Sequence, residues 1–324
     1  MSLPYFDSTA VRAAAPWTTA IAALEHALLH GVDPEDDSPR LFSPAPSGEF
    51  LLMPASGQRY SGIKALTVAP ANPARGLEKI QGVYILFDSD TLAPLATMDG
   101  NELTAIRTPA TTLLAVKHIL ASAPDGAPRS HESTERNRVL VFGTGVQALN
   151  HLRAAHAVLP DASFAVVGRR PERVTALIGQ LAAEGIDVRP GSQAEVPALV
   201  PQASVVICAT SSRTPLFDGG LVAPGAVVAA VGQHGLDARE VDAGLVLRSD
   251  IVVEGRASAL REAGDLIPAR SAEDWESIRP ANLLDLVKGE FERSPGKPCL
   301  YAGVGMAWED LATAAVVYEG GTRT

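Results

Sequence analysis

Apolar residues recur along this chain at two different spacings, and the spacing separates the expected helices from the expected strands. Apolar residues that return every three or four positions are typical of amphipathic helices, whereas short alternating or continuous apolar runs are typical of strands. Between residues 49 and 98 the runs are strand-like and are separated by Gly, Pro, Asn and Asp turn signals. We expect strands over residues 49–54, 62–69, 80–88 and 94–98. They predict an antiparallel or mixed sheet.

Helices are expected on both sides of this sheet in the sequence. Asp7 or Ser8 is placed to cap a short first helix, and a second is expected over residues 18–30. The last helical pattern covers residues 307–319, and we expect this helix to return to the first domain.

A long helix is expected to begin at residues 99–102, whose sequence DGNE resembles a capping box. Pro109 conflicts with an unbroken helix, so either the helix kinks there or Thr108 caps a new one. In both cases Arg107 lies at an irregular point of the backbone, where functional side chains are common.

From residue 138 onward, strand-like and helix-like segments alternate. A polar segment rich in Pro and Ser, residues 122–137, precedes them and is expected to be a loop between domains. Strands are expected over residues 139–142, 164–167, 205–209, 226–232 and 251–254, and helices over 172–184, 237–244 and 282–288. This alternation predicts an α/β fold with a doubly wound parallel sheet.

The first of these strands leads into a glycine motif that is typical of dinucleotide binding. Gly143, Gly145 and Ala148 have the spacing G-x-G-x-x-A between the strand and an amphipathic helix. Gly143 suits a tight turn, Gly145 lets the backbone approach a pyrophosphate, and Ala148 lets the helix pack closely on the strand. The free N–H groups at the start of that helix form an anion site.

The residues after the second strand indicate which cofactor binds. An NAD site usually carries an acidic residue about 20 residues beyond the motif, for the ribose 2′-hydroxyl. Here Arg169 and Arg170 stand in that region, and arginine suits a 2′-phosphate. We therefore expect NADP to be preferred, with use of NAD as well left open.

Composition narrows the class of protein. The chain has 324 residues, a formal charge of −10 and two cysteines. The negative charge argues against a nucleic-acid partner, and Cys208 and Cys299 are read as reduced thiols. Neither a signal peptide nor an apolar run long enough for a membrane span is apparent. We expect a cytoplasmic protein with a small-molecule substrate and no membrane or metal site.

Three basic residues of the first domain are placed unlike ordinary surface charges. Arg40 lies in SPRLF, Lys64 lies inside an apolar strand, and Arg107 lies at the helix irregularity. A buried lysine is costly unless it finds an anion, so these cations either converge on a substrate carboxylate or pair with acids of the chain. Both alternatives stay open here.

Several longer segments resemble the ornithine cyclodeaminase/mu-crystallin family. They include YSGIKALTVAPANPARGLEKIQGVYILFD, PLATMDGNELTAIRTPATTLLA, VFGTGVQA, VGQHGLDAREVD and GVGMAWEDLATAAVVYE, and the resemblance runs from about residue 40 to residue 319. It implies a substrate-binding and dimerisation domain, residues 1–119 and 301–324, and a Rossmann domain, residues 120–300. It also implies a homodimer.

The resemblance assigns roles to particular residues. Arg40, Lys64 and Arg107 would hold a substrate carboxylate, with Met53 and Gln81 lining the pocket, and Gly303 and Gly305 would lie close to the nicotinamide. The rest of the expected cofactor site is the motif and the ends of two later strands: Thr144, Val146, Gln147, Ala209, Thr210, Val231 and Gly232.

Position 234 departs from the cyclodeaminases. Those enzymes carry an Asp there that engages the substrate amine, and this chain has His234. A histidine is still a plausible proton carrier near neutral pH, so we name His234 and Lys64 as candidate catalytic residues. Glu309 and Asp310 are interpreted as acids that offset the dipole of the last helix.

These features favour an NAD(P)H-dependent oxidoreductase that reduces a C=N bond next to a carboxylate. Two alternatives are an ornithine cyclodeaminase, which is a lyase that uses NAD catalytically, and a non-catalytic protein that binds small ligands as mu-crystallins do. The sequence does not identify the side chain of the substrate.

Overall fold

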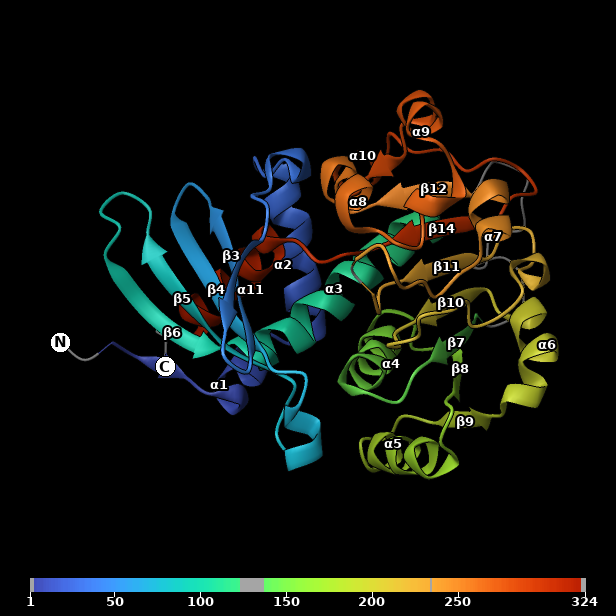
Figure 1. The fold of residues 1–324 in the computed structure, drawn as a ribbon, viewed down its shortest axis with the longest axis horizontal. Helices are drawn as coiled ribbons and strands as arrows, with labels where there is room; N and C mark the ends of the chain where they lie inside the picture. Colours follow the sequence, from blue (N-terminus) through green and yellow to red (C-terminus); the bar gives the residue numbers. More distant parts are fainter. Residues whose placement is uncertain (1–2, 123–136, 234, 322–324) are drawn as a thin grey trace. The chain divides into compact units, whose positions relative to one another are not determined.

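The computed structural model describes residues 3–122, 137–233 and 235–321. The chain divides into two compact units, which are treated separately below (Figure 1). Unit 1 comprises residues 1–108 and 306–324, and unit 2 comprises residues 109–305. The domain boundaries expected at residues 119 and 301 both fall inside unit 2, one within a helix and the other within a strand.

Unit 1 is built on a mixed six-stranded sheet with the order β1-β6-β5-β4-β3-β2. Its strands are β1 (Tyr5–Phe6), β2 (Leu41–Ala45), β3 (Gly48–Ser56), β4 (Tyr60–Val68), β5 (Ile80–Asp88) and β6 (Pro94–Asp99). Only β1 and β6 pair in parallel. The expected mixed sheet is therefore present. The pattern missed β1, which has two residues, and β2, an edge strand that contains Pro44 and has mostly exposed side chains.

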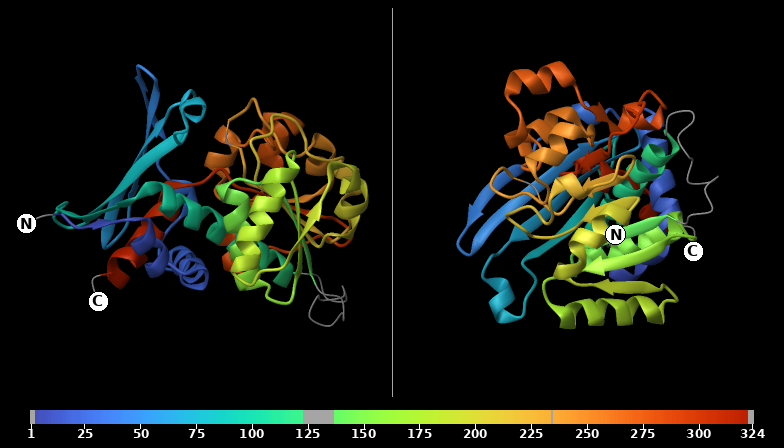
Figure 2. Two further views of the ribbon diagram at one scale, coloured as in Figure 1. Left: turned by 90° about the horizontal axis from the view of Figure 1, so that it is seen from below. Right: turned by 90° about the vertical axis from the view of Figure 1, so that its right-hand side faces the viewer.

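Helices cover one face of this sheet (Figure 2, left). They are α1 (Ser8–Ala14), α2 (Trp17–Leu29) and α11 (Ala307–Gly321), and the short 3₁₀ turns of the unit are η1 (Pro34–Asp36) and η2 (Asn72–Arg75). Asp7 caps α1 by accepting a hydrogen bond from the Ala10 N–H. The last helix returns to the first part of the chain, as expected, and packs on α2, β3 and β4.

The long helix α3 (Gly100–Ala121) runs without a break through Pro109. Asp99 caps its start by accepting from the N–H groups of Asn101 and Glu102, whereas the Glu102 carboxylate pairs with Arg12. The alternative in which Thr108 caps a new helix is wrong. A proline inside a helix costs about 3 kcal/mol. Burial of α3 on nearly all sides offsets this cost.

Unit 2 is a doubly wound α/β fold, as predicted. Its eight strands are all parallel, in the order β13-β12-β14-β11-β10-β7-β8-β9. They are β7 (Arg138–Phe142), β8 (Ser163–Val167), β9 (Val188–Gly191), β10 (Val205–Cys208), β11 (Val227–Ala230), β12 (Asp250–Val253), β13 (Ala281–Asn282) and β14 (Cys299–Ala302). The strand order reverses between β7 and β10, the point at which such folds bind ligands.

The helices of unit 2 connect these strands (Figure 1). They are α4 (Val146–Val158), α5 (Pro171–Ala183), α6 (Val196–Leu199), α7 (Ala243–Arg248), α8 (Arg256–Glu262), α9 (Ala272–Ile278) and α10 (Leu283–Val287), with η3 (Gln193–Glu195), η4 (Val200–Gln202), η5 (Gly219–Leu221) and η6 (Ile267–Ala269). Among the described residues, no helix combines the length and apolar character needed to cross a membrane.

Two expectations for unit 2 need correction or fall outside the structure. The helix expected over residues 237–244 is wrong, because Asp242 caps α7 and the helix begins only at Ala243. The sequence pattern also missed the strands β9, β13 and β14, which have four, two and four residues. Most of the expected interdomain loop, residues 123–136, lies outside the described residues.

Candidate active site

The glycine motif lies at the point where the strand order of unit 2 reverses. Gly143 follows β7 with φ +126°, and a Cβ there would lie 2.4 Å from the Ala209 carbonyl oxygen at the end of β10. Gly145 is the N-cap of α4, and a Cβ there would meet no other atom within 4 Å. Packing therefore explains Gly143 but not Gly145, whereas the approach of a pyrophosphate to the backbone explains Gly145. The motif fits a dinucleotide.

Two exposed arginines follow the neighbouring strand. Arg169 and Arg170 lie between β8 and α5, and Arg170 is the N-cap residue of that helix. Neither guanidinium forms an ion pair or hydrogen bond with the described residues. Their charge is therefore available to an anionic ligand, as binding of a 2′-phosphate requires.

The remaining residues expected to bind the cofactor lie at the same edge of the sheet. Ala209 and Thr210 directly follow β10, and Val231 and Gly232 directly follow β11. The Gly303 N–H donates to the Ala230 carbonyl at 3.0 Å, which places the segment after β14 beside the end of β11. The fold thus gathers, at the carboxyl ends of β10, β11 and β14, residues that are far apart in the sequence.

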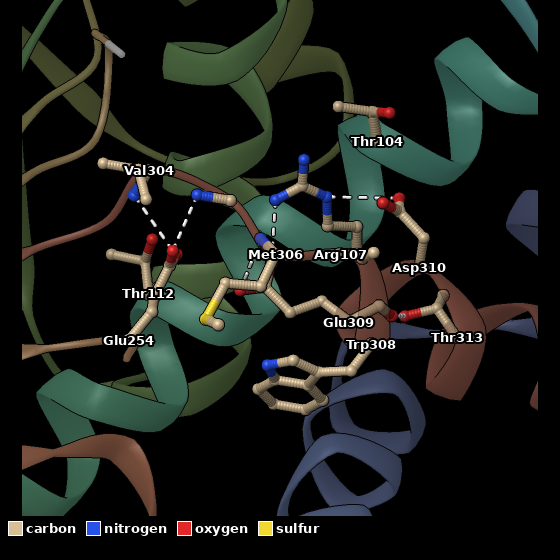
Figure 3. A network of polar contacts seen from close by, with 12 residues as sticks. Thr104, Arg107, Thr112, Glu254, Val304, Met306, Trp308, Glu309, Asp310 and Thr313 are labelled. Carbon is tan, nitrogen blue, oxygen red and sulfur yellow. Dashed lines mark hydrogen bonds and ion pairs between the residues drawn. The ribbon is translucent and has the colours of Figure 1, made fainter. Parts of the chain in front are cut away.

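In unit 1, two buried cations meet two buried acids, and Figure 3 shows one of the cations, Arg107, with the acids Glu309 and Asp310. The Lys64 Nζ of β4 donates to Asp310 Oδ2 at 2.6 Å and to Thr104 Oγ1 at 3.3 Å. The Arg107 Nη1 of α3 donates to Glu309 Oε2 at 2.7 Å, and its Nε lies 3.3 Å from Asp310 Oδ1. We call these four side chains the buried charge cluster.

Burial shifts the pKa values of Lys64 in the cluster and of Asp37 near it. Desolvation lowers the pKa of Lys64 to about 8, although the adjacent Asp310 carboxylate opposes the shift. The positive charges of Arg107 and Arg40 lower the Lys64 pKa further, so Arg40 acts on the same ammonium. Asp37 accepts from the N–H groups of Ala307 and Trp308 at the start of α11, and burial raises its pKa to about 6. An ammonium with a pKa near 8 gives up its proton more readily than an ordinary lysine.

Of the other residues expected to bind the substrate, Met53 lies beside Lys64 of the cluster and Gln81 lies away from it. Met53 is buried on β3 and pairs with Lys64 in the sheet register. Gln81 pairs with Thr67, three positions beyond Lys64, so it lies on the opposite face and does not join the cluster. His234 lies outside the described residues. No group of three or more His, Cys, Asp or Glu side chains among the described residues could hold a metal ion.

Comparison with known proteins decides the family. The family model described as ornithine cyclodeaminase/mu-crystallin matches residues 10–323. The chain belongs to this family. Two curated relatives are similar along almost their whole length. The Delta(1)-pyrroline-2-carboxylate reductase 2 of Burkholderia ambifaria is 35% identical over 312 residues, 96% of this chain and 93% of the relative. The Delta(1)-pyrroline-2-carboxylate/Delta(1)-piperideine-2-carboxylate reductase of Azospirillum brasilense is 33% identical, with the same coverage.

A solved structure of a similar protein has the same fold. The Delta(1)-pyrroline-2-carboxylate reductase of Thermococcus litoralis, in complex with NADH and L-proline, superposes with a TM-score of 0.83 at 24% identity. The superposition covers 99% of this chain and 98% of the other. The expected Rossmann-type fold with a second domain is therefore confirmed.

The structure of the present protein changes the interpretation of two acidic residues. Glu309 and Asp310 do lie in the first turn of α11, but they are fully buried and bind Lys64 and Arg107. They were interpreted from the sequence as dipole-offsetting acids, which are usually exposed to solvent. Their place among the apolar residues of AWEDLATAAVV was the available signal, because an acid on an apolar helix face needs a buried cation.

We expect Asp310→Asn to lower the free energy of unfolding by about 3–5 kcal/mol, because it leaves Lys64 and Arg107 buried with one partner fewer. The measurement is chemical denaturation followed by circular dichroism. Glu319→Gln is the matched control: it removes the exposed ion pair with Arg59 and should cost less than about 1 kcal/mol. Equal losses in both variants would contradict the importance of the buried charge cluster.

Proposed function

We propose that this family member is an NAD(P)H-dependent reductase of a C=N bond next to a carboxylate. The proposed substrates are cyclic imino acids such as pyrroline-2-carboxylate and piperideine-2-carboxylate. The observation that carries the proposal is that Lys64 and Arg107, which the family resemblance assigns to carboxylate binding, are buried together, and that Arg40 adds a positive charge beyond the two that Glu309 and Asp310 balance. Two curated relatives, each matched over 93% of its length, are named as pyrroline-2-carboxylate reductases, and one of them also as a piperideine-2-carboxylate reductase.

The side chains of unit 1 would bind and orient the imino acid. Arg107 and Arg40 hold its carboxylate, and Met53 supplies an apolar wall. Glu309 and Asp310 fix the directions of the Arg107 guanidinium and the Lys64 ammonium, because each acid binds its cation at a defined atom. A carboxylate held in this way fixes the face of the adjacent imine carbon.

The cofactor would be held by unit 2. Gly143, Gly145 and the start of α4 hold the pyrophosphate, and Arg169 and Arg170 hold the 2′-phosphate. When bound, the reduced nicotinamide supplies a hydride to the imine carbon. The Lys64 Nζ then supplies the proton for the imine nitrogen, for which its lowered pKa of about 8 is suited.

We expect the purified protein to oxidise NADPH when given pyrroline-2-carboxylate or piperideine-2-carboxylate, and Arg107→Lys to raise KM strongly with nearly unchanged NADPH affinity. A lysine cannot reproduce the planar fork of the guanidinium. Absorbance at the NADPH band measures turnover, and ornithine with trace NAD and ammonia detection tests the lyase alternative. Absence of both NADPH oxidation and ammonia release would favour non-catalytic ligand binding. Wild-type kinetics of Arg107→Lys with a lowered Tm would reject its role in carboxylate binding.

We expect NADPH to bind more tightly than NADH, and Arg169→Ala to remove most of this preference. The lost charge-assisted hydrogen bond corresponds to about tenfold to a hundredfold in Kd. The comparison uses fluorescence titration with both cofactors. Arg189→Ala is a suitable control, because Arg189 is an exposed arginine of the same unit that already pairs with Glu195. Equal dissociation constants for NADPH and NADH in the unaltered protein would overturn the assignment.

We also propose a homodimer that forms through unit 1. The face of its sheet opposite to the helices carries apolar side chains that remain exposed, including Leu41, Phe50 and Val83. Exposed apolar patches of this kind mark association sites.

Val83→Asp should therefore convert the dimer into monomers, since a second copy would have to bury the new charge. Light scattering at micromolar concentration measures the mass. Leu247→Asp, at an exposed apolar residue of α7 in unit 2, should leave the mass unchanged. A monomer in the unaltered protein would refute the proposal.

A further inference from the structure

A buried carboxylate joins the two loops that follow β10 and β11. Glu240 is fully buried, and its Oε1 accepts hydrogen bonds from both the N–H and the hydroxyl of Thr210, each at 2.7 Å. Its Oε2 accepts from the Gly232 N–H at 2.7 Å. One side chain therefore satisfies donors from two separate loops at the carboxyl edge of the sheet.

The contact between these loops leaves no spare room. A Cβ at Gly232 would lie 2.2 Å from the Thr210 carbonyl oxygen and 2.7 Å from Glu240 Oε1. The backbone of Glu240 is itself held, because Asp265 Oδ1 accepts from the N–H groups of Glu240 and Val241 at 2.5 and 3.0 Å. Asp265 thus holds the backbone that carries the Glu240 carboxylate, and this carboxylate determines how close the two loops lie.

These loops lie on one side of the point where the strand order reverses. The glycine motif after β7 is at that point, and Arg169 and Arg170, which suit the 2′-phosphate of the adenosine ribose, follow β8 on the other side. A dinucleotide that crosses the reversal point places its two halves over the two halves of the sheet. The nicotinamide half of the cofactor therefore belongs over the loops that Glu240 joins.

We infer that Glu240 is a positioning residue for the nicotinamide half of the cofactor, an inference that rests on the proposed function. It acts through the backbone of Thr210 and Gly232, which would contact the nicotinamide ribose and ring. An apolar residue would leave three partly buried donors without this acceptor. A neutral amide would turn an NH₂ group toward one of them. Only a carboxylate accepts from both loops.

The protonation state of Glu240 should control this positioning. Burial raises its pKa to about 7, and the nearby Asp265 carboxylate raises it further, whereas the hydrogen bonds from Thr210 and Gly232 lower it. The other groups concerned are Cys208, on which Glu240 acts, and Arg239, which acts on Asp265. Below the pKa, one oxygen carries a proton and no longer accepts freely, so the loops are joined less firmly.

The test compares Glu240→Gln with Asp242→Asn by fluorescence titration of the full-length protein. Asp242 is a matched control, because its carboxylate also accepts from two backbone N–H groups, but these belong to Gly219 in η5 and Leu245 in α7 and not to the residues at the ends of β10 and β11. NADH is titrated beside NADPH, because NADH lacks the 2′-phosphate that itself titrates near pH 6.

We expect Glu240→Gln to weaken NADH and NADPH binding by about tenfold at pH 8, with a fall in kcat and little change in the KM of the imino acid. Asp242→Asn should lower Tm without changing either dissociation constant. In the unaltered protein, NADH binding should weaken by up to about tenfold between pH 8 and pH 6, and Glu240→Gln should remove this pH dependence.

The outcomes separate the inference from the function on which it rests. Absence of cofactor binding in the unaltered protein would refute the proposed function. Tight binding there, with unchanged dissociation constants and an unchanged pH profile in Glu240→Gln, would overturn the positioning role alone. A loss of binding that Asp242→Asn reproduces would also overturn it, because general destabilisation would then suffice.

Discussion

The buried charge cluster of Lys64, Arg107, Glu309 and Asp310 is the interaction on which unit 1 depends. Its members come from a strand, a long helix and the last helix of the chain, and so from positions far apart in the sequence. Removing any of these charges from water is costly, and the cost is recovered only where an opposite charge is met at hydrogen-bond distance. The cluster therefore fixes where α11 can pack on the sheet and how α3 is turned against it.

The same cluster connects stability with chemistry. Two cations and two acids balance within it, and Arg40 adds a positive charge that the Lys64 ammonium senses. Desolvation and the neighbouring cations hold the Lys64 pKa well below that of an exposed lysine, while Asp310 limits the shift. The arrangement that stabilises unit 1 thus also lowers the pKa of the Lys64 ammonium, which is the property that the proposed proton donor requires.

Unit 2 uses buried carboxylates in a different way, as acceptors for the backbone. Glu240 binds the loops after β10 and β11, and Glu254 at the end of β12 accepts from the N–H groups of Val304 and Gly305 after β14. The carboxyl ends of parallel strands leave N–H groups in the following loops without sheet partners. A buried acid satisfies several of them at once, which makes the ligand-binding edge of the sheet well defined.

The sequence by itself determined the elements whose signals are local. The glycine motif, the alternation of strands and helices, and the strands between residues 49 and 98 follow from period, turn residues and close approach of the backbone, and all of them are present. The resemblance to the family also placed Lys64 and Arg107 together. One expectation was wrong because packing overrides local preference: α3 continues through Pro109 because it is buried on nearly all sides. Another was wrong because a local signal was missed, since the Asp242 cap starts α7 only at Ala243. Only the tertiary structure decided the partners of charged groups. Strand register and long-range packing decide that Asp310 faces a buried lysine and not water, on which sheet face Gln81 lies, and which loops Glu240 joins. The pattern of neighbouring residues in the sequence carries no information about these contacts.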